Sequence, residues 1–182
     1  MDHNVMDAVP EKDGDVLFEN VHVRDRKFFK EFYTFFFFKR PILIALYIVM
    51  ALSMAVNLIS FFLGEKDSLQ WTIAPILWVL LVLFLWWRNI KVATARQKES
   101  GNGEWIVYTI KIFEDRILYE TSLGTTMNFE IAGIKRINCT KSYLLLRTTA
   151  YQIIPIEKDC FTKGTYEGFC DFLRTKGYKV KG

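Results

Sequence analysis

The chain has 182 residues, of which 51% are hydrophobic and 16% aromatic, and a formal net charge of +4 at pH 7. A basic excess this small does not favour a nucleic-acid-binding protein, which normally carries a strongly basic face. With three cysteines and two histidines, and no closely spaced ligand pair, the chain is also a poor candidate for a disulfide framework or a zinc site.

Residues 1–15 are predicted to form a disordered acidic tail, because carboxylates outnumber the lone Lys12, and Pro10 and Gly14 interrupt any periodicity. Residues 16–23 alternate apolar and polar side chains imperfectly. This pattern predicts the first strand of a soluble domain.

The segment 25–39 has the pattern of an amphipathic helix, with Lys and Arg on one face and aromatic rings on the other. We expect this helix to lie in the inner membrane interface, with its rings among acyl chains. The rings assigned to the interface are Phe28, Phe29, Phe32 and Phe36. The helix would serve either as a simple anchor or as a sensor of lipid charge and packing.

Two long apolar runs dominate the chain. Residues 41–63 contain no charged side chain and, at about 1.5 Å per residue, are long enough to cross a bilayer core of about 30 Å. Residues 71–90 are predicted to form the second crossing, joined to the first by an extracytoplasmic loop at 64–70. Uncharged stretches this long are rare in soluble cores, so the sequence predicts a transmembrane helical hairpin.

Lys and Arg flank the hairpin on both outer sides, whereas the connecting loop carries only Lys66. Because excess Lys and Arg mark the cytoplasmic side, both termini are expected in the cytoplasm and the protein in the plasma membrane. Trp71 is assigned to the outer interface, and Trp86 and Trp87 to the inner one.

Neither residues 41–63 nor the apolar run 71–87 of the second crossing contains Asp, Glu, Lys, Arg or His, so the sequence indicates no proton relay or ion ladder. Ala51, Ala55 and Asn57 are assigned to helix packing, because small and amide side chains allow close approach. That packing is either within the hairpin or between copies. Asn57 lining a pore in an oligomer is kept as an alternative.

After a basic linker helix and turn at 91–103, the period of the pattern changes to two. Short alternating runs, including 104–112, 134–140, 143–148 and 151–156, predict strands. An apolar stripe then predicts a closing helix with Thr162 as N-cap and Gly177 just past its end. The fold class expected is a membrane α-helical hairpin plus an α+β soluble domain. Residues 104–182, with 16–23, would form a seven-stranded antiparallel barrel or sandwich with a C-terminal helix.

This architecture, together with the closing stretch IIPIEKDCFTKGTYEGFCDFLRTKG, resembles the YcxB-like family of small bacterial membrane proteins. The residues that carry the resemblance are Ile154-Pro155, Phe161, Phe169, Phe172-Leu173 and Gly177. The resemblance implies a soluble part like a bacterial pleckstrin-homology (PH) domain and brings no catalytic or binding residues. Gly164 and Gly168 depart from the firm closing helix that the family pattern implies.

No motif of an enzyme occurs: there is no Gly-rich phosphate loop, no G-x-S-x-G and no H-E-x-x-H. We therefore expect no catalytic activity, no cofactor and no metal. Cys139 and Cys170 lie at apolar positions and are interpreted as small buried hydrophobic residues.

The function predicted is a membrane-anchored binding module, acting as an adaptor or regulator of another membrane protein through a strand edge or the groove beside the closing helix. A lipid-responsive module is the alternative, in which Lys135 and Arg136 contact anionic headgroups, although these two could equally protect a strand edge. A second alternative is a small oligomeric pore or transport subunit. The expected partners are membrane lipids and another membrane protein, and the sequence leaves the oligomeric state open.

Overall fold

The computed structural model describes residues 14–64 and 70–180, which divide into two compact units. The sheet unit contains residues 14–21, 109–138 and 144–180, and the helical unit contains 22–108 and 139–143. Nearly all of the predicted acidic tail 1–15 and of the predicted loop 64–70 lies outside the described residues.

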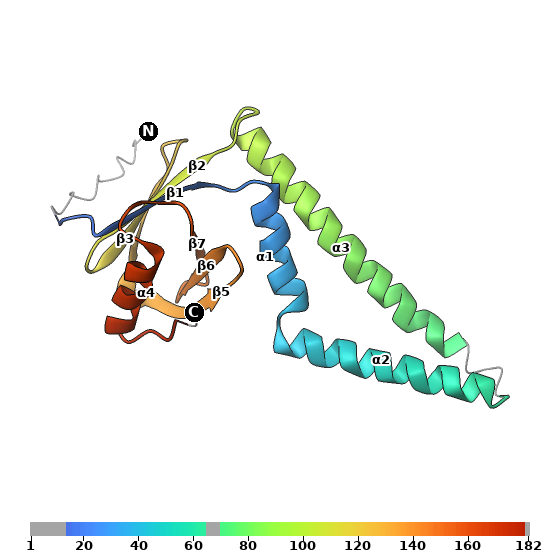
Figure 1. Ribbon diagram of the computed structural model, residues 1–182. Coiled ribbons are helices and arrows are strands. Elements are labelled where there is room, and N and C mark those ends of the chain that lie inside the picture. The colour runs from blue at the N-terminus through green and yellow to red at the C-terminus, as the bar shows by residue number, and fades with distance from the viewer. Residues whose placement is uncertain (1–13, 65–69, 181–182) are drawn as a thin grey trace, which may run out of the picture. The chain divides into compact units, whose positions relative to one another are not determined.

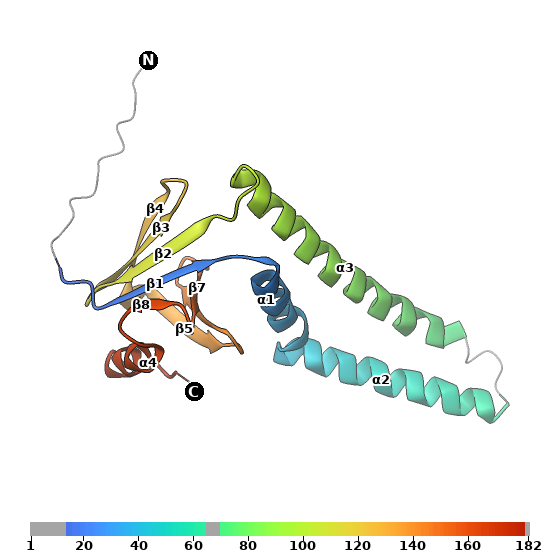
Figure 2. The same cartoon turned by 45° about the horizontal axis from the view of Figure 1, so that its top comes forward.

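The strands form two antiparallel sheets (Figures 1 and 2). The larger has the order β4-β3-β2-β1-β8, and the smaller β5-β6-β7. The larger sheet is built from β1 (Phe18–Val23), β2 (Val107–Ile112), β3 (Arg116–Thr121), β4 (Thr126–Glu130) and β8 (Phe161–Lys163). The smaller is built from β5 (Ile134–Cys139), β6 (Tyr143–Thr148) and β7 (Ile153–Glu157). The 3₁₀ turn η2 (Ile131–Gly133) comes directly before β5.

The structure corrects the predicted count of seven strands, because the described residues form eight. They also do not close into a barrel. The additional strand, β8, pairs antiparallel with β1, with Lys163 opposite Glu19. Gly164 follows β8 at φ +77°, and a Cβ there would lie 2.4 Å from the ring of Phe18. Gly164 therefore permits a close backbone turn and does not belong to the helix it was expected to weaken.

The closing helix α4 spans Tyr166–Thr175, so Thr162, the predicted N-cap, lies in β8 instead. The N-cap is Thr165, whose hydroxyl accepts a hydrogen bond from the Gly168 N–H at 3.1 Å. At the other end Gly177 has φ +88°, and the Tyr178 N–H donates to the Leu173 carbonyl at 3.0 Å. This is the Schellman arrangement that the position of Gly177 predicted.

The core of the sheet unit is formed by residues that alternate along the strands and by the apolar face of α4. Ile110, Ile112, Leu144 and Phe169 are fully buried. The fully buried Asn20 of β1 crosses between the sheets: its amide donates to the Glu157 carbonyl at 2.7 Å and accepts from the Glu157 N–H at 3.3 Å. One side chain thus satisfies both backbone groups at the end of β7.

The helical unit contains α1 (Arg26–Phe38), α2 (Pro41–Phe62) and α3 (Gln70–Ser100). The second apolar run and the basic segment after it form one continuous helix, α3, which the turn around Asn102 and Gly103 ends. Figures 1 and 2 show that the C-terminal end of α2 and the N-terminal end of α3 lie near each other, and that α1 lies between the other ends of these helices.

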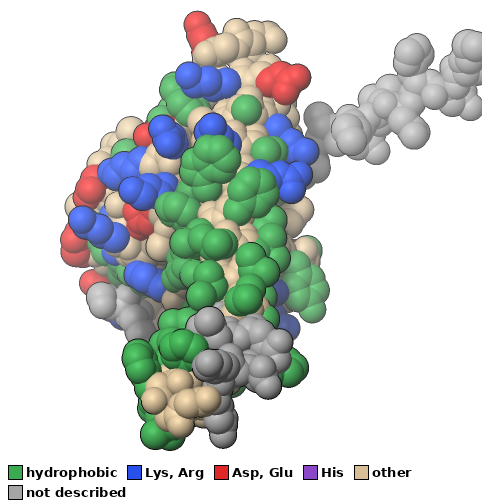
Figure 3. All heavy atoms as spheres, turned by 90° about the vertical axis from the view of Figure 1, so that its right-hand side faces the viewer, with side chains coloured by type: hydrophobic (Ala, Val, Ile, Leu, Met, Phe, Trp, Pro, Cys, Tyr) green, Lys and Arg blue, Asp and Glu red, His purple; other side chains and the backbone are tan. Residues whose placement is uncertain are grey.

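Both α2 and α3 are long and apolar enough to cross a membrane. No residue of α2 is buried, although the helix is hydrophobic all round. Hydrophobic side chains form a band over the helices in Figure 3, with Lys and Arg above it. A soluble core helix would hide such a surface, so these exposed faces fit a membrane protein.

A lysine-lined cavity as candidate functional site

The candidate site is built on the polar face of α1. Asp25 caps this helix by accepting a hydrogen bond from the Phe28 N–H at 2.8 Å. At helical spacing, Lys27, Lys30 and Glu31 share one face with Phe35, while the rings of Phe28, Phe32 and Phe36 follow one another on a different face. The cap therefore sets the register in which three charged side chains meet on one surface.

The turn between β5 and β6 packs on this same helix. The Ser142 N–H donates to Glu31 Oε1 at 2.7 Å, although 111 positions separate the two residues. Beside this bond, the rings of Phe28 and Tyr143 meet edge to face at 5.0 Å between centroids. A polar and an apolar contact together fix the turn against α1 within the helical unit.

Burial raises the pKa of the Glu31 carboxyl, but the Ser142 N–H, the Thr140 and Ser142 hydroxyls and the charge of Lys27 together outweigh this effect. The net result is a pKa below the usual range. Glu31 is therefore ionised at neutral pH, and its carboxylate already accepts a hydrogen bond from the Ser142 N–H of the turn.

A cavity of about 230 Å³ lies between α1 and the turn. Its lining is dominated by lysines: Lys27, Lys30, Glu31, Thr34, Phe35, Lys39, Thr140 and Lys141. Four lysines against one glutamate leave an excess of three positive charges, and all four lysines are exposed. Such a concave basic surface attracts a small anion with several oxygen atoms, because each ammonium group offers three donors.

The cavity lies where the polar part of the helical unit meets its apolar part. Lys39 lines it, and Pro41 begins the apolar helix α2 only two residues later. On the α3 side, the Trp86 indole N–H donates to the Thr34 hydroxyl at 3.3 Å, and the Lys91 ammonium lies 4.0 Å from the Trp87 ring centroid. Lysines and tryptophans at the end of an apolar helix are typical of a membrane–water interface.

A second, apolar cavity of about 290 Å³ lies between α2 and α3. Apart from the Tyr47 hydroxyl its side chains carry no oxygen or nitrogen: Phe38, Tyr47, Met50, Ala51, Met54, Pro75, Val79, Val82 and Leu83. The Tyr47 hydroxyl donates to the Phe37 carbonyl at 2.9 Å, which ties α2 to the end of α1.

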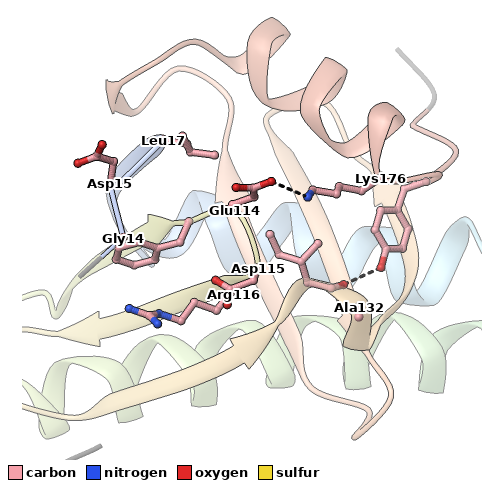
Figure 4. A pocket seen from close by; sticks show the side chains of 11 residues that line it. Gly14, Asp15, Leu17, Glu114, Asp115, Arg116, Ala132 and Lys176 are labelled. Atoms are coloured by element: carbon pink, nitrogen blue, oxygen red, sulfur yellow. Dashed lines mark hydrogen bonds and ion pairs between the residues drawn. The ribbon is translucent and has the colours of Figure 1, made fainter. Parts of the chain in front are cut away.

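A third cavity, of about 780 Å³, is in the sheet unit, between the N-terminal segment, the β2–β3 turn and the end of α4. Figure 4 shows Glu114 pointing toward Lys176, and the two groups lie 3.6 Å apart. Asp15 and Asp115 face the cations Arg116 and Lys176 around the same opening. Because charges of both signs line it and its one ion pair is exposed, this cavity favours no class of ligand.

The sequence-predicted interface rings have different surroundings in the structure. Phe28 is 3% exposed and contacts Tyr143, so it packs in the protein and not among acyl chains as we expected. The rings of Phe29, Phe32 and Phe36 are half-buried, and the Arg40 guanidinium lies 4.5 Å from the Phe36 ring centroid. Trp71 and Trp87 are exposed, whereas Trp86 is half-buried.

Of the predicted packing residues, Ala51 lines the apolar cavity, Ala55 is exposed and Asn57 is half-buried on the face of α2 that also carries Met50 and Met54. The predicted headgroup ligands Lys135 and Arg136 are exposed on β5 in the sheet unit. They do not line the lysine cavity. The sequence signal that could have indicated this cavity is the spacing of Lys27, Lys30 and Glu31, but the long-range contribution of Lys141 has no local signal.

The other titratable groups do not form a competing site. His22 is buried, and burial first, with the charge of Arg24, lowers its pKa to about 3, so it is neutral at pH 7. Cys170 is buried, and Cys139 and Cys160 are half-buried thiols. Within residues 14–64 and 70–180, no three His, Cys, Asp or Glu side chains are grouped to hold a metal ion.

Residues 112–173 match the profile of the YcxB-like protein family. The matched segment runs from the end of β2 to Leu173 of α4, so it contains most of the sheet unit. This match confirms, for residues 112–173, the family resemblance stated from the sequence. No curated protein and no solved structure matches this chain.

Proposed function

We propose that this YcxB-like protein is a two-pass protein of the plasma membrane that binds the anionic headgroup of a membrane lipid in the lysine cavity on α1. The observation that carries the proposal is the convergence of four lysines on a concave surface two residues from the start of an apolar helix. The role proposed is binding and not catalysis.

Charge supports this ligand class. Lys and Arg close to an anionic membrane surface each contribute about 1 kcal/mol of binding free energy. Glu31 does not cancel this attraction fully, because its single negative charge stands against four lysines in the cavity lining. Phosphate oxygens are acceptors, which match the three donors of each lysine ammonium group.

The position of the lysines also supports an orientation. Lys39 and Arg40 directly precede α2, and Arg88 and Lys91 follow the apolar run that ends at Trp87 within α3. Since Lys and Arg gather on the cytoplasmic side of spanning helices, we place the lysine cavity and both termini in the cytoplasm. The headgroups of the inner leaflet, which is rich in anionic lipid, would then be at the level of the cavity.

The test is native mass spectrometry of the full chain with phosphatidylglycerol and with phosphatidylcholine. The double variant Lys27→Gln, Lys30→Gln removes two charges without changing the helical spacing. We expect it to lose about 2 kcal/mol of binding free energy, equivalent to roughly thirtyfold in affinity for phosphatidylglycerol.

The matched control is Lys135→Gln, Arg136→Gln, which removes the same charge from the exposed face of β5. Unchanged phosphatidylglycerol binding in this control, with loss in the α1 variant, supports the cavity. Equal losses in both variants would show only a general charge effect, and no loss in the α1 variant would refute the proposal.

A second candidate function is the adaptor or regulator of another membrane protein, and one observation favours it. Strand β4 lies at the edge of the larger sheet, and four of its five residues are exposed, Met127 to 43%. An exposed edge is a ready surface for a strand from a partner protein.

Asn128→Pro removes a backbone N–H from this edge and tests the adaptor hypothesis. In crosslinking and affinity purification from native membranes, the variant is expected to lose the partner that the wild-type chain recovers. Asn128→Ala keeps the N–H and serves as control. Recovery of the same proteins with the Pro variant would contradict strand pairing at β4.

A further inference from the structure

We propose that one anionic phospholipid occupies both cavities of the helical unit, with its headgroup among the lysines of α1 and one acyl chain in the apolar cavity between α2 and α3. This inference rests on the proposed headgroup site and extends it to a defined chain-binding groove. It makes the lipid a bound ligand of the folded protein and not only part of the surrounding bilayer.

Residues of the last turns of α1 contribute to the lining of both cavities. Thr34 and Phe35 line the lysine cavity, and Phe38, one helical turn after Thr34, lines the apolar cavity. The residue that follows, Lys39, lines the lysine cavity again. A molecule with a charged end and an apolar end can therefore contact both cavities along one side of the same helix.

The contacts around Trp86 hold this junction in place. Its indole N–H donates to the Thr34 hydroxyl at 3.3 Å, and its ring lies 6.2 Å from the ring of Phe38. The Tyr47 ring is 6.1 Å from Phe38 and 5.4 Å from Trp78. Aromatic side chains from α1, α2 and α3 thus contact one another where the linings of the charged and the apolar cavity come together on α1.

The apolar cavity suits a hydrocarbon chain better than a polar ligand. Its volume of about 290 Å³ is near the lower end, about 300 Å³, of the range for small-molecule pockets. Met50 and Met54 face it from α2, and methionine side chains adapt to flexible apolar ligands. From Tyr47 to Met54 the groove follows α2 over about 10 Å, at about 1.5 Å per residue.

A second copy of this chain is the competing occupant, since Ala51 in the groove would permit close helix approach. The charges favour lipid, because a copy of this helical hairpin presents no anion to the lysines. Neither α2 nor the described part of α3 up to Trp87 contains Asp or Glu. An anionic phospholipid satisfies the charged and the apolar cavity together.

The test is photocrosslinking of the full chain in nanodiscs, using phosphatidylglycerol with a diazirine on one acyl chain. Crosslinked residues are then mapped by mass spectrometry. We expect crosslinks at Met50 and Met54 to exceed those at Ile59 and Phe62 by about fivefold or more. With the phosphatidylcholine analogue of the probe, this preference is expected to disappear.

The variant Ala51→Phe fills the groove, and Ala55→Phe is the matched control, because Ala55 is exposed one turn further along the helix and does not line the groove. We expect Ala51→Phe to reduce the crosslinks at Met54 by about fivefold and Ala55→Phe to leave them unchanged. Circular dichroism and gel filtration check that both variants are folded.

The outcomes separate this inference from the proposed headgroup site. Crosslinks spread evenly over α2, while Lys27→Gln, Lys30→Gln still loses phosphatidylglycerol in native mass spectrometry, would overturn the groove and leave the headgroup site standing. Crosslinks between two chains at Met50 or Met54 would assign the groove to a second copy and also overturn the inference. Equal groove labelling by both probes would refute the link between chain and headgroup.

Discussion

The sheet unit and the helical hairpin are both rich in apolar side chains, but they place them in opposite ways. In the sheet unit, Ile110, Ile112, Leu144 and Phe169 are fully buried between strands and α4. In α2 no residue is buried, and Leu52 and Val56 are each 62% exposed. The sheet unit therefore hides its apolar surface in its own core, whereas the hairpin requires an apolar environment outside the protein.

The same contrast explains where the candidate site lies. Strand alternation gives the sheet unit a separate polar surface, on which charges of both signs are spread. In the hairpin, α2 and the part of α3 up to Trp87 contain no Asp, Glu, Lys or Arg, and the lysines of α1 line one cavity that includes Lys39, two residues before the start of α2. Positive charge is therefore concentrated beside the start of the apolar helix α2.

Phe169→Asp should break the sheet unit and leave the hairpin intact. Phe169 is fully buried and contacts Phe18 and Phe161 at 5.5 and 5.8 Å between ring centroids. An unpaired carboxylate at this position should cost more than about 4 kcal/mol of stability. Limited proteolysis should then degrade residues 109–180, while alkaline extraction still finds the chain in the membrane.

Tyr151→Asp is the control for that variant, because Tyr151 is 70% exposed and has φ +62°, which Asp tolerates. It should leave the protease resistance unchanged. Wild-type resistance of Phe169→Asp would mean that α4 does not contribute to the core.

Leu52→Asp tests the opposite environment. On the surface of a soluble protein, a substitution at a side chain 62% exposed changes stability by no more than about 0.5 kcal/mol. In the middle of a spanning helix, Asp costs about 2.5 to 3.5 kcal/mol of insertion free energy. We expect a measurable loss of membrane-inserted protein in a glycosylation-based insertion assay, with Leu52→Ala as control. Full insertion of Leu52→Asp would argue against α2 crossing the bilayer.

A smaller, pH-dependent effect is expected at His22, which stacks on Tyr108 with 5.8 Å between ring centroids. Burial and Arg24 lower its pKa from 6.5 to about 3. Below pH 6.5 the unfolded chain takes up a proton that the folded chain does not, so the free energy of unfolding falls as the pH falls toward 3. The slope is at most about 1.4 kcal/mol per pH unit.

The check is thermal unfolding in nanodiscs at pH 6.5 and pH 5, a window above the ordinary pKa of Asp and Glu. The wild-type chain should lose about 2 kcal/mol over this window, since 1.5 pH units separate its ends. His22→Phe retains a ring against Tyr108 but cannot be protonated, and its stability should change less. Equal pH dependence in both chains would assign the effect to another group.

Features with a local period were predictable from the sequence, and features made by distant residues were not. The uncharged run before Gly64 predicted α2, and alternation predicted most strands. The three residues of β8 are too few to show a period, so the sequence does not predict this strand and predicts Thr162 as a helix cap. The Asn20–Glu157 bridge joins residues 137 positions apart, a pairing that no local pattern encodes.

The candidate site was predictable only in part for the same reason. The lysines of α1 were recognised as a membrane flank, and the aromatic face of this helix as apolar. The hydrogen bond between Glu31 and Ser142 holds the β5–β6 turn against α1, so that Lys141 lines the same cavity as Lys27 and Lys30. From the sequence, headgroup contact is assigned instead to Lys135 and Arg136, since local patterns do not tell which basic residues share a surface.

The most direct test of the central claim is hydrogen–deuterium exchange of the full chain in nanodiscs, with and without phosphatidylglycerol in a phosphatidylcholine bilayer. If the lysine cavity holds an anionic headgroup, exchange should slow at residues 27–39 and 140–142 when phosphatidylglycerol is present, and residues 134–136 of β5 should not change. The Lys27→Gln, Lys30→Gln variant should lose the protection. Unchanged exchange at residues 27–39 and 140–142, or equal slowing at 134–136, would contradict a specific headgroup site on α1.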